Sequence, residues 1–154
     1  MTDRPPRVPP GAPAELESVL AGMSFEVVPG RFALAGFAAA PAAEDLAALG
    51  EGPAQLVREG GETTLLLPLE ELAAVLARHP ESVSESPLAW IRFRAPMGWE
   101  LVGFLAHVTG SLAAAGVPLG AVCGFSRDHL FVHERFLDEA LGVLETLFDR
   151  APAP

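Results

Sequence analysis

The chain has 154 residues, of which 50% are hydrophobic, and its formal net charge at pH 7 is −10. This length is enough for one ordinary domain or for two small domains that share a core. The acidic balance argues against a nucleic acid as partner, because binding phosphate requires a basic face.

The sequence also bears on the expected compartment. No apolar run reaches the roughly 18 residues that a membrane-spanning helix needs. The N-terminus lacks the apolar stretch of a secretory signal. Cys123 is the single cysteine and cannot form an internal disulfide. We therefore expect a cytoplasmic protein that does not enter a membrane.

The first part of the chain predicts a short lead-in followed by a first repeat. Residues 1–12 are rich in proline and predict a disordered segment. The first repeat is expected over residues 13–80, and its Gly60-Gly61 pair predicts a hairpin turn. Its predicted helices cover 15–21, 44–49 and 70–78, and its predicted strands cover 31–39, 54–58 and 62–67.

A second repeat with the same order is expected over residues 84–149, with a frayed tail over 150–154. Its predicted strands cover 88–94, 118–125 and 128–134, its predicted helices cover 99–115 and 135–149, and Ser126-Arg127 forms a hairpin tip. The order strand–helix–strand–strand–helix, seen twice, predicts an α+β fold with an antiparallel sheet and helices on one face.

Residue alternation along two predicted strands separates two faces of the second repeat. The aliphatic set is expected beneath the helices; it comprises Ala89, Ile91, Leu130 and Val132, together with Phe93. The opposite, mixed set is Trp90, Arg92, His129 and Phe131. An open sheet face with exposed aromatic side chains is unusual in a monomer, so this set predicts an oligomer interface, most simply that of a homodimer.

Several segments resemble the ACT domain, a βαββαβ module of regulatory proteins that binds amino acids and other small metabolites. The strand, loop and helix start over residues 90–103 and the hairpin over 123–132 carry this resemblance. Leu20-Ala-Gly-Met-Ser24, Glu62-Thr-Thr-Leu-Leu-Leu-Pro68 and Asp128-His-Leu-Phe-Val132 are similar to segments of small bacterial double-ACT proteins of unassigned function. The resemblance implies two ACT-like, ferredoxin-like repeats side by side.

The loop before the predicted helix at 99–115 is the first candidate site. Backbone N–H groups at a helix start can hold a carboxylate or a phosphate, and Gly103 would let a ligand approach closely. An unoccupied strand–helix turn is the alternative. Pro96 and Met97 stand where the family usually has small polar residues, which leaves the backbone as the main donor.

The hairpin over 123–128 is the second part of the candidate site, because ACT modules often complete their pocket there. Gly124 would leave room beside the sheet, and Asp128 could accept from an ammonium group, although Asp and Ser also stabilise ordinary turns. Family members usually carry a histidine where Arg127 stands. The predicted ligand-binding residues are Met97, Gly98, Trp99, Glu100, Leu101, Val102, Gly103, Cys123, Gly124, Phe125, Ser126 and Asp128.

Other chemistry has little support in the sequence. His129 and His133 lie about 13 Å apart on an extended strand, too far to share one metal ion. Cys123 has no nucleophile signature and is expected to be buried and inert. No phosphate-binding loop, catalytic carboxylate pair or zinc motif is present. We therefore expect no catalytic residues, no metal and no cofactor.

Three functions follow from these observations. The first is a regulatory sensor that binds a small molecule, expected to be an amino acid, and acts through an unknown partner protein. The second is an oligomeric interaction scaffold that kept the ACT fold without a ligand. The third, a small transferase-like enzyme, is disfavoured because no catalytic group of residues supports it.

Overall fold

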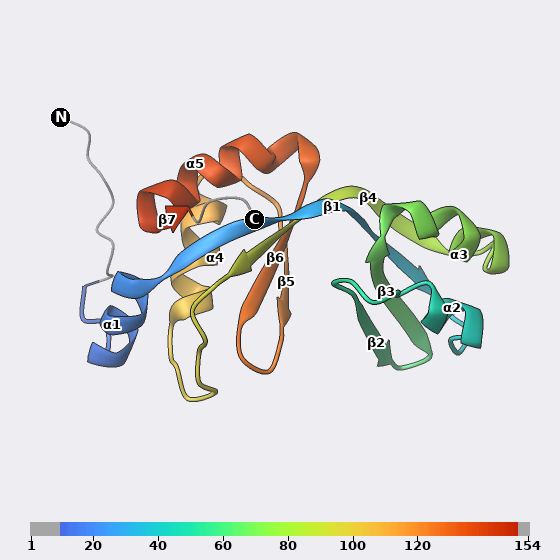
Figure 1. The fold of residues 1–154 in the computed structure, drawn as a ribbon, viewed down its shortest axis with the longest axis horizontal. Coiled ribbons are helices and arrows are strands. Elements are labelled where there is room, and N and C mark those ends of the chain that lie inside the picture. Colours follow the sequence, from blue (N-terminus) through green and yellow to red (C-terminus); the bar gives the residue numbers. More distant parts are fainter. Residues whose placement is uncertain (1–9, 151–154) are drawn as a thin grey trace. The chain divides into compact units, whose positions relative to one another are not determined.

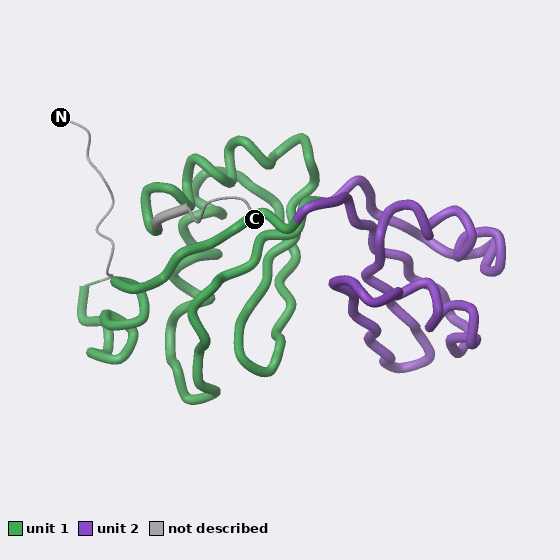
Figure 2. Tube along the Cα trace, in the orientation of Figure 1, with its two compact units in different colours: residues 1–28, 89–154 green, residues 29–88 purple. Residues whose placement is uncertain are grey.

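The computed structural model describes residues 10–150. The predicted lead-in and tail fall largely outside this range. The described chain forms two compact units (Figure 2), of which unit 2 spans residues 29–88 and unit 1 combines the residues up to 28 with those from 89 onward. Strands β1 (Ser24–Phe37) and β4 (Val83–Phe93) each contribute to both units.

Unit 2 contains a complete strand–helix–strand–strand–helix–strand series (Figure 1). Between β1 and β4 lie α2 (Ala43–Ala47), β2 (Gln55–Glu59), β3 (Glu62–Pro68), the 3-10 turn η1 (Leu69–Glu71) and α3 (Leu72–Arg78). Strand β3 pairs antiparallel with β1 on one side and with β2 on the other. The predicted hairpin turn is confirmed, since Gly60 and Gly61 join β2 to β3 with φ values of 50° and 92°. Positive φ values are readily adopted by glycine alone.

Unit 1 contains the remaining elements. These are α1 (Ala14–Gly22), the start of β1, the end of β4, α4 (Phe104–Ala114), β5 (Gly120–Cys123), β6 (Asp128–His133), the 3-10 turn η2 (Glu134–Phe136), α5 (Leu137–Leu147) and β7 (Asp149–Arg150). Strands β5 and β6 form an antiparallel hairpin, and β7 pairs parallel with β1. The hydrogen-bonded order is β1–β4–β6–β5, with β7 added to β1.

A strand from the start of the chain completes unit 1. The Ser24 carbonyl accepts a hydrogen bond of 2.9 Å from the Arg94 amide, and Phe25 is buried in the core of unit 1. The division therefore differs from the expected repeats at 13–80 and 84–149, because residues 14–28 pack with the C-terminal elements. The predicted α+β fold and its twice-repeated order are confirmed.

Each unit has its own hydrophobic core. In unit 2, alternate residues of β1 and β3 pack with Leu72 and Val75 of α3. In unit 1, the predicted aliphatic set of β4 and β6 is buried against α1, α4 and α5. The helix residues in that core are Leu16, Leu20, Phe104, Val108, Leu112, Ala140, Leu144 and Leu147. The predicted inner face is thus confirmed.

The opposite face of unit 1 corrects an expectation. Trp90 and Phe131 are 4% and 3% exposed, so this face is not an open aromatic surface. The two rings make an edge contact with centroids 4.4 Å apart, and the His129 ring lies 5.4 Å from Trp90. Nη1 of Arg92 lies 3.3 Å from Oε1 of Glu26 in an ion pair. Packing within the chain covers the aromatic side chains that were expected to meet a second copy.

Several boundaries also differ from the predicted ones. Strand β1 begins at Ser24 instead of residue 31, since Pro29-Gly30 imitates a turn but lies within the strand. Helix α4 begins at Phe104 instead of residue 99, because its preceding residue, Gly103, has a φ of 97°. No helix in the described part of the chain is long and apolar enough to cross a membrane.

Candidate functional site

A cavity of about 250 Å³ lies in unit 1, where the start of α4 meets the β5–β6 hairpin. Three segments form its walls: the loop after β4, the first turn of α4, and the hairpin tip. Nine of the predicted ligand-binding residues line it: Met97, Gly98, Trp99, Leu101, Gly103, Cys123, Gly124, Phe125 and Asp128. The structure thus places the loop and the hairpin, the two parts of the candidate site, at one cavity.

Some residues were placed differently by sequence reasoning. Glu100, Val102 and Ser126 do not line the cavity, whereas Arg127 and the first turn of α4, Phe104–Ala106, do. The helix residues were missed because the helix was expected to begin at Trp99. The positive φ at Gly103 sets the true start, and the glycine itself was the available signal.

The backbone donors of the cavity come from the helix and less from the loop. The Met97 amide donates to the Ser126 carbonyl at 2.7 Å, and the Leu101 amide donates to the Gly98 carbonyl at 3.1 Å. Two backbone amides of the loop, those of Met97 and Leu101, therefore already donate hydrogen bonds within the chain. The first bond within α4 runs from the His107 amide to the Gly103 carbonyl at 2.9 Å. Geometry gives the preceding three amides no partner within the helix, so the best donors lie at 104–106.

Two opposite charges at the hairpin tip also line the cavity. Arg127 and Asp128 are adjacent in sequence, and the Gly124 amide closes the tip by donating to the Arg127 carbonyl at 2.9 Å. The amides at the start of α4 carry partial positive charge. The cavity therefore offers positive potential at the helix start and a carboxylate at the hairpin.

Cys123 differs from the expected buried thiol. It is exposed at the end of β5 and lies opposite Asp128 in the strand register. A hydrogen bond to the Asp128 carboxylate, together with burial and the carboxylate's charge, raises the pKa of this thiol above 9.0. A raised pKa leaves less thiolate at neutral pH, which makes the thiol a poor nucleophile.

Two glycines at this site have structural reasons of their own. A Cβ atom at Gly103 would lie 3.0 Å from Cδ2 of Leu16, in addition to the strain at its positive φ. A Cβ atom at Gly124 would lie 3.1 Å from the Arg127 carbonyl oxygen and 3.3 Å from Nε2 of His129. The space that was expected beside Gly124 is therefore occupied by His129.

His129 packs beside Gly124, one of the residues that line the cavity. Burial, followed by the charges of Arg92 and Arg127, lowers the pKa of His129 below 6.5, against a smaller opposing effect of Asp128. Its Nδ1 atom is buried and has no hydrogen-bond partner among the described residues. The side chain packs as an aromatic ring, as its edge contact with Trp90 shows.

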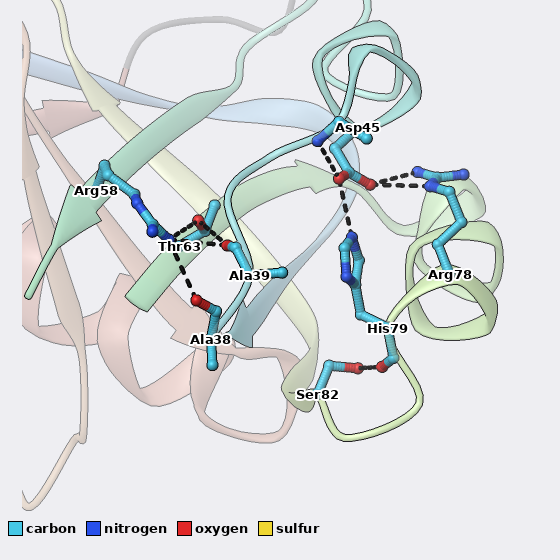
Figure 3. Close-up of polar contacts among 9 residues, drawn as sticks. Ala38, Ala39, Asp45, Arg58, Thr63, Arg78, His79 and Ser82 are labelled. Atoms are coloured by element: carbon cyan, nitrogen blue, oxygen red, sulfur yellow. Dashed lines mark hydrogen bonds and ion pairs between the residues drawn. The ribbon is translucent and has the colours of Figure 1, made fainter. Parts of the chain in front are cut away.

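A buried polar cluster lies in unit 2, around Asp45 (Figure 3). The Asp45 side chain is 0% exposed and accepts hydrogen bonds from the Ala42 amide at 2.8 Å and from Arg78 Nε at 2.9 Å. Nε2 of His79 lies 2.8 Å from Oδ2 of Asp45, the oxygen that also accepts from the Ala42 amide, and the His79 ring stacks on Phe37. Sequence reasoning missed this cluster, since Asp45 lies in a helix of only five residues.

These contacts decide the charge of Asp45. Burial alone would raise the pKa of this carboxyl, but the hydrogen bonds from Ala42, His79 and Arg78 outweigh burial and lower the pKa below 3.8. In a separate group of polar contacts in unit 2, Arg58 donates to the Ala39 carbonyl at 2.8 Å and to Thr63 Oγ1 at 2.6 Å (Figure 3). The contacts of Asp45 join α2 to α3, and those of Arg58 join the β2–β3 hairpin to the segment after β1.

Two further observations limit the chemistry. Within residues 10–150, no group of three or more His, Cys, Asp or Glu side chains is arranged to hold a metal ion. A larger groove of about 1140 Å³ lies along α1, α4 and α5. Small residues form much of it, and His107 and Glu139 are the titratable groups among its lining residues. The smaller cavity is lined by one positive and one negative side chain, those of Arg127 and Asp128.

The chain was compared with known proteins. Residues 83–146 match the ACT domain family. No curated protein matches the chain. A solved protein of unknown function from Vibrio cholerae, described as a possible transport protein, is 26% identical, with a TM-score of 0.66 over 86% of this chain and 96% of its own.

Two further solved structures share the fold. A protein from Agrobacterium tumefaciens is 18% identical, with a TM-score of 0.69 over 86% of this chain and 94% of its own. The ligand-free regulatory subunit of aspartate kinase from Thermus thermophilus is 17% identical, with a TM-score of 0.57 over 82% of this chain and 96% of its own. Residues 83–146 are therefore similar to an ACT domain, and the chain shares the fold of these solved structures.

Proposed function

We propose that this chain is a regulatory module that binds an amino acid in the cavity between the start of α4 and the β5–β6 hairpin. ACT domains are generally regulatory modules that bind amino acids. The observation that carries the proposal is the pairing of charges in this cavity, where the helix-start amides and Arg127 lie together with Asp128. A carboxylate fits the first group, and an ammonium fits the second.

The strength of such contacts suits a metabolite sensor. Each charge-assisted contact contributes about 1.5–3 kcal/mol. After the costs of association, two such contacts support binding in the micromolar to millimolar range. The chain then acts without catalysis or cofactor, through a partner protein in the cytoplasm.

An interaction scaffold is the second candidate function. Trp99 is 93% exposed and Phe125 is fully exposed, and large apolar side chains on a surface often mark a contact with another protein. A scaffold would bury these side chains in an assembly and would bind no amino acid.

Calorimetric titration with the common amino acids at up to millimolar concentration tests the proposal. Wild-type protein is expected to bind at least one of them, and Arg127→Gln or Asp128→Asn should weaken binding about tenfold or more by removing one charged contact. Arg135→Gln and Asp138→Asn are matched controls, because both side chains are exposed and neither lines the cavity. Absence of binding, or equal binding by all four variants, would exclude this cavity as an amino acid site.

A further inference from the structure

Two aromatic side chains at the cavity are exposed to solvent. Trp99 comes from the loop before α4, Phe125 comes from the hairpin tip, and both line the same cavity. Other aromatic side chains of unit 1, such as Trp90, Phe93 and Phe104, are buried. Exposed large apolar groups that converge on one cavity indicate a surface that is covered when the protein functions.

The remaining walls of the cavity are also mostly apolar. Met97, Leu101 and Leu105 line it and are partly buried, and each packs against the core of unit 1. The polar side chains among its lining residues are those of Cys123, Arg127 and Asp128. If the two charged residues hold the head group of an amino acid, the rest of the ligand meets apolar surface.

The size of the cavity further restricts the ligand. Its volume of about 250 Å³ is below the roughly 300–1,000 Å³ of typical sites for drug-sized ligands. A single amino acid fits this volume better than a nucleotide or a dinucleotide cofactor. A polar side chain on the ligand would lose its water without gaining hydrogen bonds from these walls.

We infer that the ligand is an amino acid with a large apolar side chain, such as phenylalanine or leucine, and that Trp99 and Phe125 close over this side chain. This inference rests on the proposed function and adds the class of ligand to it. Trp99 and Phe125 then determine specificity, whereas Arg127, Asp128 and the helix-start amides hold the head group that all amino acids share.

Titrations with four amino acids that share this head group test the inference. L-phenylalanine and L-leucine are expected to bind wild-type protein at least about tenfold more tightly than L-serine and L-aspartate, as expected for apolar contacts in a pocket. Trp99→Ala and Phe125→Ala should each weaken phenylalanine binding several-fold and leave serine binding unchanged. Leu46→Ala is the control, since Leu46 is an exposed apolar residue of unit 2.

Fluorescence provides a second readout. The chain has two tryptophans, of which Trp90 is buried and Trp99 is exposed. Phenylalanine should shift the emission of wild-type protein to shorter wavelength, and Trp99→Phe should abolish this shift while retaining binding.

The possible failures are distinguishable. Tighter binding of serine or aspartate than of phenylalanine, with no effect of Trp99→Ala, would overturn the apolar ligand class and leave the proposed function standing. Equal affinity for all four would do the same. Absence of binding by all four, and by every other amino acid, would overturn both.

Discussion

Replacement of Asp45 by alanine should destabilise the protein strongly, because its carboxylate is buried and makes all of its hydrogen bonds within unit 2. Removing one partner of a buried ion pair costs about 3–5 kcal/mol. Arg78 is 30% exposed and can regain water, whereas His79 and the Ala42 amide are less accessible. We therefore expect a loss near the lower limit, about 3 kcal/mol, in the free energy of unfolding.

Urea unfolding followed by far-UV circular dichroism measures this loss. Glu44→Ala is a matched control, since Glu44 is the neighbouring carboxylate in α2 and is exposed. Its effect should stay within about 0.5 kcal/mol. If Asp45→Ala is no less stable than Glu44→Ala, the cluster does not hold unit 2 together as described.

The same cluster predicts a dependence on pH. The folded-state pKa of Asp45 lies below its ordinary value of 3.8, so its stabilising effect is complete above that pH and is lost as the pH falls through the folded-state pKa. Wild-type protein should therefore lose stability more steeply than Asp45→Ala below about pH 4. Parallel curves for the two proteins would contradict the assigned hydrogen bonds.

Three more predictions concern unit 1. Gly103→Ala should lower the free energy of unfolding by about 1–3 kcal/mol, because Gly103 has a φ of 97° and the new Cβ would lie 3.0 Å from a methyl group of Leu16. Gly110→Ala in α4 has open space around the new Cβ and should be stabilising. Thermal unfolding compares the two variants. Cys123 should react slowly with iodoacetamide at pH 7.5, and Asp128→Asn should accelerate the reaction several-fold by lowering the thiol pKa; equal rates would contradict the hydrogen bond. Burial lowers the pKa of His129 below 6.5 in the folded protein, so the imidazole takes up a proton more readily in the unfolded chain. The free energy of unfolding should therefore fall as the pH drops below about 6.5. His129→Gln should lack this part of the decline.

The fold could be predicted from the sequence largely because its pattern of apolar residues is regular. Alternation along β4 and β6 correctly identified the face that packs against the helices, with Ile91, Phe93, Leu130 and Val132. The strand at 24–28 was not predicted, since Pro29-Gly30 imitates its end. Because this strand was not predicted, its pairing within unit 1 was not predicted either. Such a pairing joins residues far apart in the sequence and has no local signal.

The candidate site could be predicted in part. The loop was identified from the strand–loop–helix order and Gly103, the hairpin was identified from the resemblance to ACT domains, and the structure places both at one cavity. The helix was expected to begin at Trp99 but begins at Phe104, five residues later. The backbone amides expected to donate to a ligand were therefore misplaced as well. Trp90 was expected on an open face and Trp99 against the core, whereas Trp90 is buried and Trp99 is exposed. Burial depends on tertiary contacts that strand alternation does not reveal.

The most direct test of the central claim is a titration of ¹⁵N-labelled protein with L-phenylalanine, followed by amide chemical shifts. Binding in the proposed cavity predicts that the largest shifts are those of Phe104, Leu105 and Ala106 at the start of α4 and of residues 124–128 in the hairpin. Shifts confined to the groove along α1, α4 and α5 or to unit 2, or no shifts at millimolar phenylalanine, would contradict the claim.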